Sequence, residues 1–216
     1  MIKAVIFDLD GTLVDTNGIH LENFRKDFPK QFGFRPKDSE VLPLFGKSAV
    51  EIAQILARKR GIKLDAKKLV EFARLKESLF VKSAKGKHFL SKANFLFLKK
   101  LKARGLKIAI ASGSSRKMLN ASLKTFERKL FDCIVCADDV LHSKPNPLMI
   151  FKALKCLRVK KGNAVFVGDG FLDAKTAKNA NLRFVAVLSG ITSRKQFEKF
   201  KPLLIVKKAR DLGKVL

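Results

Sequence analysis

Two carboxylates, Asp8 and Asp10, stand at the end of the apolar run Ala4–Phe7. On a β-strand, residues i and i+2 project from the same face. Carboxylates held side by side at the end of a buried strand repel each other, so they require a cation, a proton or a reaction that compensates for the cost. The pair therefore predicts a metal-assisted active site.

Other polar groups follow later apolar runs. Ser112–Ser114 follows the second run, and Gly168–Gly170 follows the fourth, with Asp173 four residues after Asp169. Lys144 lies between the third run and the next helical pattern. Because ligands of open parallel sheets bind outside the carboxyl ends of the strands, we expect these side chains to converge.

Such a set of groups suits Mg²⁺ and phosphate. Mg²⁺ prefers oxygen ligands and takes one or two protein carboxylates together with water and substrate phosphate oxygens. A lysine supplies a point charge for phosphate, while Ser112 and the free amides at helix starts supply hydrogen-bond donors. These parts predict phosphoryl transfer, in which an aspartate can act as the nucleophile and form an aspartyl phosphate.

The elements that must position these groups alternate along the chain. Apolar runs of strand length occur at 3–8, 107–112, 133–137, 164–168, 183–188 and 203–206. Helical patterns occur at 91–104, 115–129, 146–157 and 172–180. The runs are near-continuous, as in strands that are buried on both faces of a parallel sheet. We therefore predict an α/β fold with a Rossmann-like, doubly wound parallel sheet.

Residues 15–85 break this alternation. They show helical periodicity at 18–32, 48–60 and 66–83, with no convincing strand. An insertion of this kind at the carboxyl end of a strand predicts a small α-helical cap domain over the site, while residues 1–14 and 86–216 form the α/β catalytic core.

The chain of 216 residues carries 46 basic and 19 acidic residues, a formal charge of +27. Such a field attracts phosphorylated metabolites, nucleic acid or anionic surfaces. The sequence has no Arg/Gly-rich segment and no zinc-finger spacing, and it lacks both Tyr and Trp. We therefore interpret the charge as solvated helix faces, and nucleic acid stays the less favoured partner.

No apolar run approaches the roughly 18 residues that a membrane-spanning helix needs. We expect a soluble cytoplasmic protein that is a monomer or weak dimer, with no membrane partner. The three cysteines, Cys133, Cys136 and Cys156, show no zinc spacing, so we expect buried free thiols in a reducing compartment.

Four segments, taken in order, resemble the motifs of the haloacid dehalogenase (HAD) superfamily. They are DLDGTLVDT at 8–16, ASGS at 111–114, KPNP at 144–147 and VGDGFLD at 167–173. The helical insertion after the first motif resembles the cap of subfamily I, in the phosphoglycolate phosphatase and β-phosphoglucomutase-like branch. The resemblance covers essentially the whole chain.

The resemblance implies a role for each matching residue. Asp8 would attack phosphorus, and Asp10 would protonate the leaving oxygen and later deprotonate water. Mg²⁺ would bind the Asp8 side chain, the Asp10 main-chain carbonyl and Asp169, with Asp173 behind these ligands or orienting Lys144. Ser112 and Lys144 would hold the transferring phosphoryl oxygens.

Further candidates for substrate or phosphate contact are Thr12, His20, Lys47, Gly113 and Ser114. His20 has the spacing of a histidine that faces the site in related sugar-phosphate enzymes, although a helix-start histidine fits equally well. Thr12 fits a local turn hydroxyl as readily as a substrate contact. Lys47 lies in a segment resembling the substrate loop of the cap, where it could reach a second anionic group. Lys76 is a weaker candidate, because its position fits a solvated helix face.

The favoured function is that of a Mg²⁺-dependent phosphatase for a small phosphorylated metabolite, such as phosphoglycolate or a sugar phosphate. The alternative is a β-phosphoglucomutase-like phosphotransferase, in which a sugar hydroxyl replaces water. The mutases tend to carry an arginine where this chain has Ala49, and their acidic pair differs from the GDxxxD at 168–173. A phosphatase that acts on nucleic acid, suggested by the charge, is a less favoured third interpretation.

Overall fold

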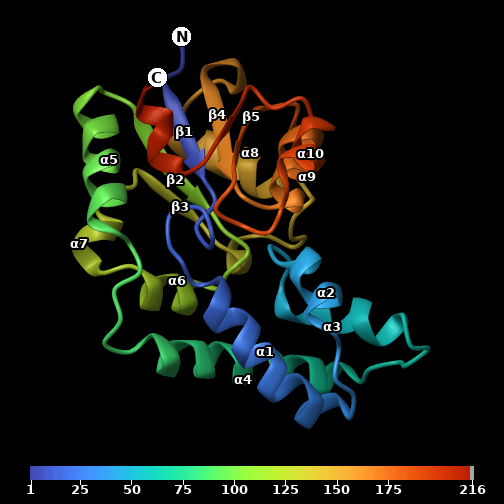
Figure 1. Ribbon diagram of the computed structural model, residues 1–216. Coiled ribbons are helices and arrows are strands. Elements are labelled where there is room, and N and C mark those ends of the chain that lie inside the picture. The colour runs from blue at the N-terminus through green and yellow to red at the C-terminus, as the bar shows by residue number, and fades with distance from the viewer. Residues whose placement is uncertain (215–216) are drawn as a thin grey trace.

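The computed structural model describes residues 1–214, whose centre is a six-stranded parallel sheet in the order β3-β2-β1-β4-β5-β6 (Figure 1). The strands are β1 Ala4–Phe7, β2 Lys107–Ala111, β3 Cys133–Val135, β4 Ala164–Gly168, β5 Arg183–Val187 and β6 Leu204–Val206. Every neighbouring pair runs parallel. All six lie within the predicted runs, so the doubly wound α/β fold is confirmed.

The central strand β1 shows why the sheet is covered on both faces. Val5 and Phe7 pack into one hydrophobic cluster, and Ala4 and Ile6 pack into a second. Successive side chains of a strand point to opposite faces. All four residues are fully buried, so each face of the sheet has its own core.

Helices lie on both faces of the sheet. They are α5 Lys92–Ala103, α6 Arg116–Ser122, α7 Thr125–Arg128, α8 Leu148–Leu157, α9 Phe171–Ala180 and α10 Arg194–Glu198. The prediction of one helix over 115–129 is wrong. Leu123 leaves helical geometry with φ −123° and ψ 130°, and its side chain is buried in the core, which divides the segment into α6 and α7.

The inserted segment consists of helices that lie below the sheet in Figure 1. They are α1 Asn17–Phe32, α2 Asp38–Val41, α3 Ala49–Arg58 and α4 Ala66–Ala84, with a 3₁₀ turn η1 at Leu42–Leu44. The sequence patterns missed α2 and η1, which are too short to show periodicity. Phe24, Phe28 and Phe72 stack edge to face or in parallel at the centre of this layer. The layer therefore has its own hydrophobic cluster, separate from the two beside the sheet.

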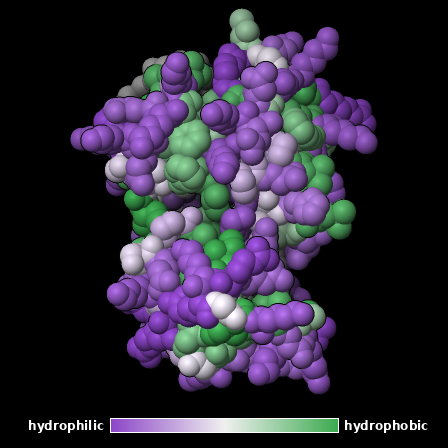
Figure 2. Space-filling model, turned by 90° about the vertical axis from the view of Figure 1, so that its right-hand side faces the viewer, coloured by the Kyte–Doolittle hydropathy of each residue, from purple (hydrophilic) through white to green (hydrophobic). Residues whose placement is uncertain are grey.

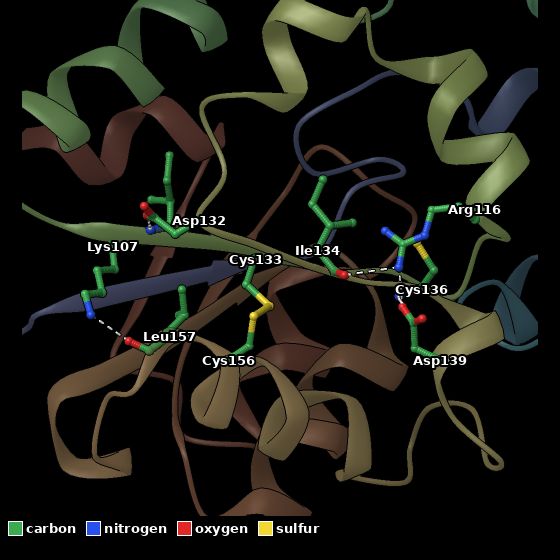
Figure 3. The surroundings of a disulfide bond; sticks show 10 residues. Lys107, Arg116, Asp132, Cys133, Ile134, Cys136, Asp139, Cys156 and Leu157 are labelled. Carbon is green, nitrogen blue, oxygen red and sulfur yellow. Dashed lines mark hydrogen bonds and ion pairs between the residues drawn. A yellow bond between two sulfur atoms is a disulfide. The ribbon is translucent and has the colours of Figure 1, made fainter.

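The prediction of free thiols is wrong for two of the three cysteines. Cys133 on β3 and Cys156 on α8 form a disulfide, with Cα atoms 6.1 Å apart (Figure 3). Cys136 is free and buried, as expected, and burial raises the pKa of its thiol to about 12. The 23-residue separation of the bonded pair conceals their proximity, because that proximity depends on how α8 packs against β3.

No helix among the described residues is long and apolar enough to cross a membrane.

Candidate active site

The turn after β1 carries the two aspartates that open the site. The amide of Asp8 donates to the carbonyl of Val167 on β4, which extends the strand pairing past Phe7. Gly11 then adopts φ +83°, a left-handed conformation that disfavours side chains. A Cβ at this position would lie 2.4 Å from an oxygen of Asp169, so the turn and the fourth strand end are in direct contact.

Lys144 is fully buried and joins two carboxylates. Its Nζ lies 2.5 Å from Asp8 Oδ1 and 2.7 Å from Asp173 Oδ1. Burial alone would lower the pKa of Lys144, but the charges of Asp173 and Asp8 raise it above its usual range. The lysine is therefore held as a cation beside Asp8, and the expectation that Asp173 orients Lys144 agrees with this geometry.

Asp169 faces the same cluster and accepts a hydrogen bond of 2.5 Å from the Thr12 hydroxyl. Burial and the charge of Asp173 raise the pKa of Asp169 to about 7. Burial also raises the pKa of Asp8 well above its usual range, an effect that Lys144 only partly offsets. The cluster thus holds more carboxylates than Lys144 can neutralise.

This excess of negative charge fits a divalent cation. One carboxylate oxygen from each of Asp8, Asp169 and Asp173 lies within 4.8 Å of the others. Asp173 already accepts hydrogen bonds at both oxygens, from Lys144 and from the amide of Gly170. Asp8 and Asp169 are therefore the pair that suits Mg²⁺, which needs one or two protein carboxylates.

Asp10 has a different set of partners from Asp8, including His20 of the cap. Thr16 donates to its Oδ1 at 2.5 Å, and His20 Nε2 lies 3.3 Å from the same oxygen. Ser114 and Ser112 donate to Oδ2 at 2.7 and 3.3 Å. Burial would raise the pKa of Asp10, but the hydrogen bonds and the charge of His20 lower it below its usual range. The two aspartates thus occupy different electrostatic environments.

His20 lies in the site rather than at an exposed helix start. It is buried, and its ring stacks on Phe80 of α4 with centroids 4.6 Å apart. Burial lowers its pKa, although Asp10 opposes that shift. His20 is therefore a cap residue that contacts the aspartate of the core.

The loop around Gly46 brings the cap onto the core. A Cβ on Gly113 would lie 2.3 Å from the carbonyl oxygen of Gly46, so the two backbones touch. Lys47 Nζ donates to the carbonyl of Lys144 at 3.1 Å and lies 3.7 Å from Glu51. In this arrangement Lys47 joins cap to core and also lines the cavity, and its contact with a second anionic group of the substrate stays a prediction.

The burial of Lys76 differs from what the sequence predicted. We expected a solvated face, yet the side chain is buried, and its Nζ lies 6.0 Å from the centre of the Phe24 ring. Burial lowers the pKa of Lys76 to about 8. A signal was present in the sequence, since Phe72, Lys76 and Phe80 are four residues apart and share one face of α4.

Gly190 is a residue that the sequence analysis missed. A Cβ on it would lie 1.9 Å from Asp169 Oδ2, so only glycine allows this close approach. It follows β5 at the same edge of the sheet as the other motifs, which is the signal that could have drawn attention to it.

All the core candidates surround one cavity of about 280 Å³ between core and cap. Asp8, Asp10, Gly113, Ser114 and Asp169 line it from the core, whereas His20, Lys47 and Lys76 line it from the cap. Thr12, Ser112 and Lys144 are buried beneath this surface and act on it through their hydrogen bonds. The arrangement places the Asp8 carboxylate beside the buried amine of Lys144. It places the Asp10 carboxylate beside several hydrogen-bond donors.

Comparison with known proteins agrees with this site. The haloacid dehalogenase-like hydrolase family matches residues 5–187. A curated relative, the putative pyrophosphatase PpaX of Caldanaerobacter subterraneus subsp. tengcongensis, is 29% identical over all of this chain and 94% of its own length. A putative haloacid dehalogenase-like hydrolase from Bacteroides fragilis has a TM-score of 0.84 at 26% identity, with 100% of both chains covered. A putative beta-phosphoglucomutase from Bacteroides vulgatus has a TM-score of 0.83 at 25% identity, covering 99% of this chain and 86% of its own.

Proposed function

Because the chain belongs to the haloacid dehalogenase-like hydrolase family, we propose that it is a Mg²⁺-dependent phosphatase that hydrolyses a small phosphorylated metabolite. The observation that carries the proposal is the buried contact between Asp8 and Lys144. A carboxylate does not attack an anionic phosphate readily unless a nearby positive charge offsets their repulsion. Lys144 supplies that charge at the nucleophile itself.

We assign Asp8 as the nucleophile. Lys144 engages Oδ1, so the other oxygen, Oδ2, is the one assigned to attack phosphorus. Attack forms an aspartyl phosphate as the ester oxygen of the leaving group departs, and hydrolysis by water then restores the carboxylate. Asp173 holds Lys144 from the other side, which limits the movement of its amine during these steps.

We assign Asp10 as the acid and base. In the first step a protonated Asp10 gives its proton to the leaving oxygen, and in the second its carboxylate takes a proton from water. The hydrogen bonds from Thr16, Ser114 and Ser112 stabilise the carboxylate, which is the form that the second step requires. Protonation for the first step therefore requires these donors to turn away.

The metal is assigned to Asp8, Asp169 and the main-chain carbonyl of Asp10. The side chain of Asp10 already accepts hydrogen bonds at both oxygens, so its contribution would come from the main chain. Mg²⁺ bound here would offset the negative charge of the carboxylates and of the transferring phosphoryl group.

A phosphate-release assay tests the proposal. The purified protein is supplied with Mg²⁺ and with p-nitrophenyl phosphate, 2-phosphoglycolate, sugar phosphates and pyrophosphate in parallel. We expect turnover that EDTA abolishes and that added Mg²⁺ restores. Failure to release phosphate from every compound in the presence of Mg²⁺ would overturn the proposed function.

A second candidate is pyrophosphate hydrolysis. It is favoured by the name of a curated relative, a putative pyrophosphatase, that matches all of this chain and 94% of its own length. The same panel separates the two, because a pyrophosphatase would release phosphate from pyrophosphate much faster than from any monoester.

A further inference from the structure

One part of the cap side of the cavity is an apolar wall, whereas His20, Lys47, Arg74 and Lys76 line other parts of it. The wall consists of Leu42 and Pro43 from η1, Phe45 directly after it, and Ala49 and Val50 from the first turn of α3. None of these side chains can hydrogen-bond or carry charge. A polar leaving group placed against this wall would give up its water without gaining a partner, which is unfavourable.

Two exposed apolar side chains of the core continue the same wall. Phe171 is 41% exposed and Ile191 is 49% exposed, and both line the cavity. On the face shown in Figure 2, green hydrophobic atoms gather at the waist between the larger upper body and the smaller lower body. Apolar surface at the mouth of a cavity is favourable when a ligand covers it.

Most charged groups of the lining already have partners. Lys47 is held by the Lys144 carbonyl and Glu51, and Glu77 is held by Ser115 and Lys117. Asp138 accepts a hydrogen bond from the amide of Arg116.

Two cations of the lining remain, and both lie on α4 rather than on η1 or α3, which form the apolar wall. Lys76 is buried, and its Nζ lies 6.0 Å from the centre of the Phe24 ring. Arg74 is exposed to solvent. The wall therefore offers no pair of buried cations for a second phosphate or carboxylate.

We propose that the substrate is a phosphate monoester whose leaving group is an uncharged alkyl or aryl group, bound against Phe45, Val50 and Ile191. This inference rests on the proposed phosphatase function and names its substrate class. It predicts preference for an apolar monoester over 2-phosphoglycolate and pyrophosphate, whose leaving groups are charged.

A chain-length series tests the proposal. Methyl, butyl and hexyl phosphate have similar leaving-group chemistry and differ mainly in apolar length. We expect kcat/KM to rise by roughly fourfold for each methylene that becomes buried. We also expect hexyl phosphate to exceed both 2-phosphoglycolate and pyrophosphate.

A matched pair of variants locates the effect. Val50→Thr places a hydroxyl in the wall with little change of shape, whereas Val70→Thr makes the same change on α4, where Val70 is 48% exposed and outside the cavity. Val50→Thr should lower the ratio of kcat/KM for hexyl phosphate to kcat/KM for methyl phosphate about fivefold. Val70→Thr should leave this ratio unchanged, and circular dichroism should show both variants folded.

The outcomes separate this inference from the function on which it rests. Phosphate release that is independent of chain length, or highest with a charged leaving group, overturns the inference and leaves the phosphatase function standing. Equal effects of Val50→Thr and Val70→Thr also overturn it. No release from any monoester, including p-nitrophenyl phosphate, overturns the phosphatase function itself.

Discussion

The two sides of the cavity are built by different forces. On the core side, Asp8, Lys144 and Asp173 are buried and joined by short charge-assisted hydrogen bonds. On the cap side, residues such as Phe45 and Val50 offer only apolar contact. Charge-assisted bonds require particular atoms at particular distances, whereas apolar contact requires only shape and volume. The core side is therefore suited to chemistry and the cap side to selection among leaving groups.

Three contacts near the cavity join the loop around Gly46 and the start of α3 to the core. Gly46 touches Gly113 through the backbone, and Lys47 donates to the Lys144 carbonyl. Glu51 accepts a hydrogen bond from Ser143, the residue before Lys144. The position of the cap loop is thus coupled to the segment that carries Lys144.

The largest expected effect comes from a change at Asp8, the proposed nucleophile on the core side. Asp8→Asn keeps the size of the side chain and removes its negative charge, so the covalent route is lost. We expect turnover of p-nitrophenyl phosphate to fall by roughly 10⁴-fold or more, with the fold intact by circular dichroism. Normal turnover in this variant would contradict the assignment of Asp8.

Lys144→Met tests whether the core side depends on charge pairing. It leaves Asp8 and Asp173 buried without their cation, which should lower the free energy of unfolding by about 3–5 kcal/mol. Urea unfolding at neutral pH measures the loss. A matched Lys47→Met, which removes a half-buried cap lysine, should cost far less, and an equal cost would contradict the difference between the two sides.

The third prediction concerns the disulfide and its contribution to the stability of the fold. It closes the segment 133–156, which contains Lys144, and a closed loop of this length stabilises the folded state by about 3 kcal/mol. We expect reductant to lower the free energy of unfolding by that amount. The Cys136→Ala variant should respond in the same way, and a Cys133→Ala/Cys156→Ala double variant should not respond at all. A wild-type protein indifferent to reductant would refute the expectation.

Gly113→Ala tests the backbone contact between the two sides. The added Cβ would lie 2.3 Å from the Gly46 carbonyl oxygen, so the cap loop must move away from the core. A displacement of this kind should lower kcat/KM by roughly 10²-fold. Gly162→Ala is the control, because Gly162 has no positive φ, like Gly113, and has no neighbour within 4 Å of the added atom. Equal kinetic losses in the two variants would contradict this role of the contact with Gly46.

The smallest expected effect concerns Glu51 and pH. Burial would raise its pKa, but hydrogen bonds from Ser143 and Ser48 and the charge of Lys47 lower it below its usual range. A lowered pKa in the folded state means that Glu51 stabilises the fold above its unfolded pKa, and that this is lost as pH falls through the folded pKa. Glu51→Gln should therefore flatten the fall in stability on the acid side. Parallel pH curves for the two proteins would exclude this contribution.

Much of the core side could be predicted because local patterns encode it. Asp8, Asp169 and Asp173 follow strands, and parallel strands bring their carboxyl ends to one edge. The hydrogen-bond partners of these residues could not be predicted from the sequence. Thr12 donates a hydrogen bond to Asp169, and Ser114 donates one to Asp10. Both hydrogen bonds depend on the side-chain rotamers that these residues adopt in the folded chain.

The cap side was harder to predict. Its helices were expected within a few residues, yet Lys76 was assigned to a solvated face, and the contact of Lys47 with the core was not foreseen. Both outcomes depend on how α3 and α4 pack over the core, since packing buries Lys76 and brings Lys47 to the Lys144 carbonyl. The disulfide was missed for the same reason, because α8 meets β3 only in the folded chain.

By itself the sequence determined the parallel sheet, the helical insertion and the aspartates and lysine at the strand ends. These depend on periodicity and on which residue follows a strand, both of which are local properties. Only the tertiary structure decided that Lys144 bridges Asp8 and Asp173, that Asp10 contacts His20 of the cap and that the cap wall is apolar. Those features depend on distances between segments far apart in the chain, which packing alone sets.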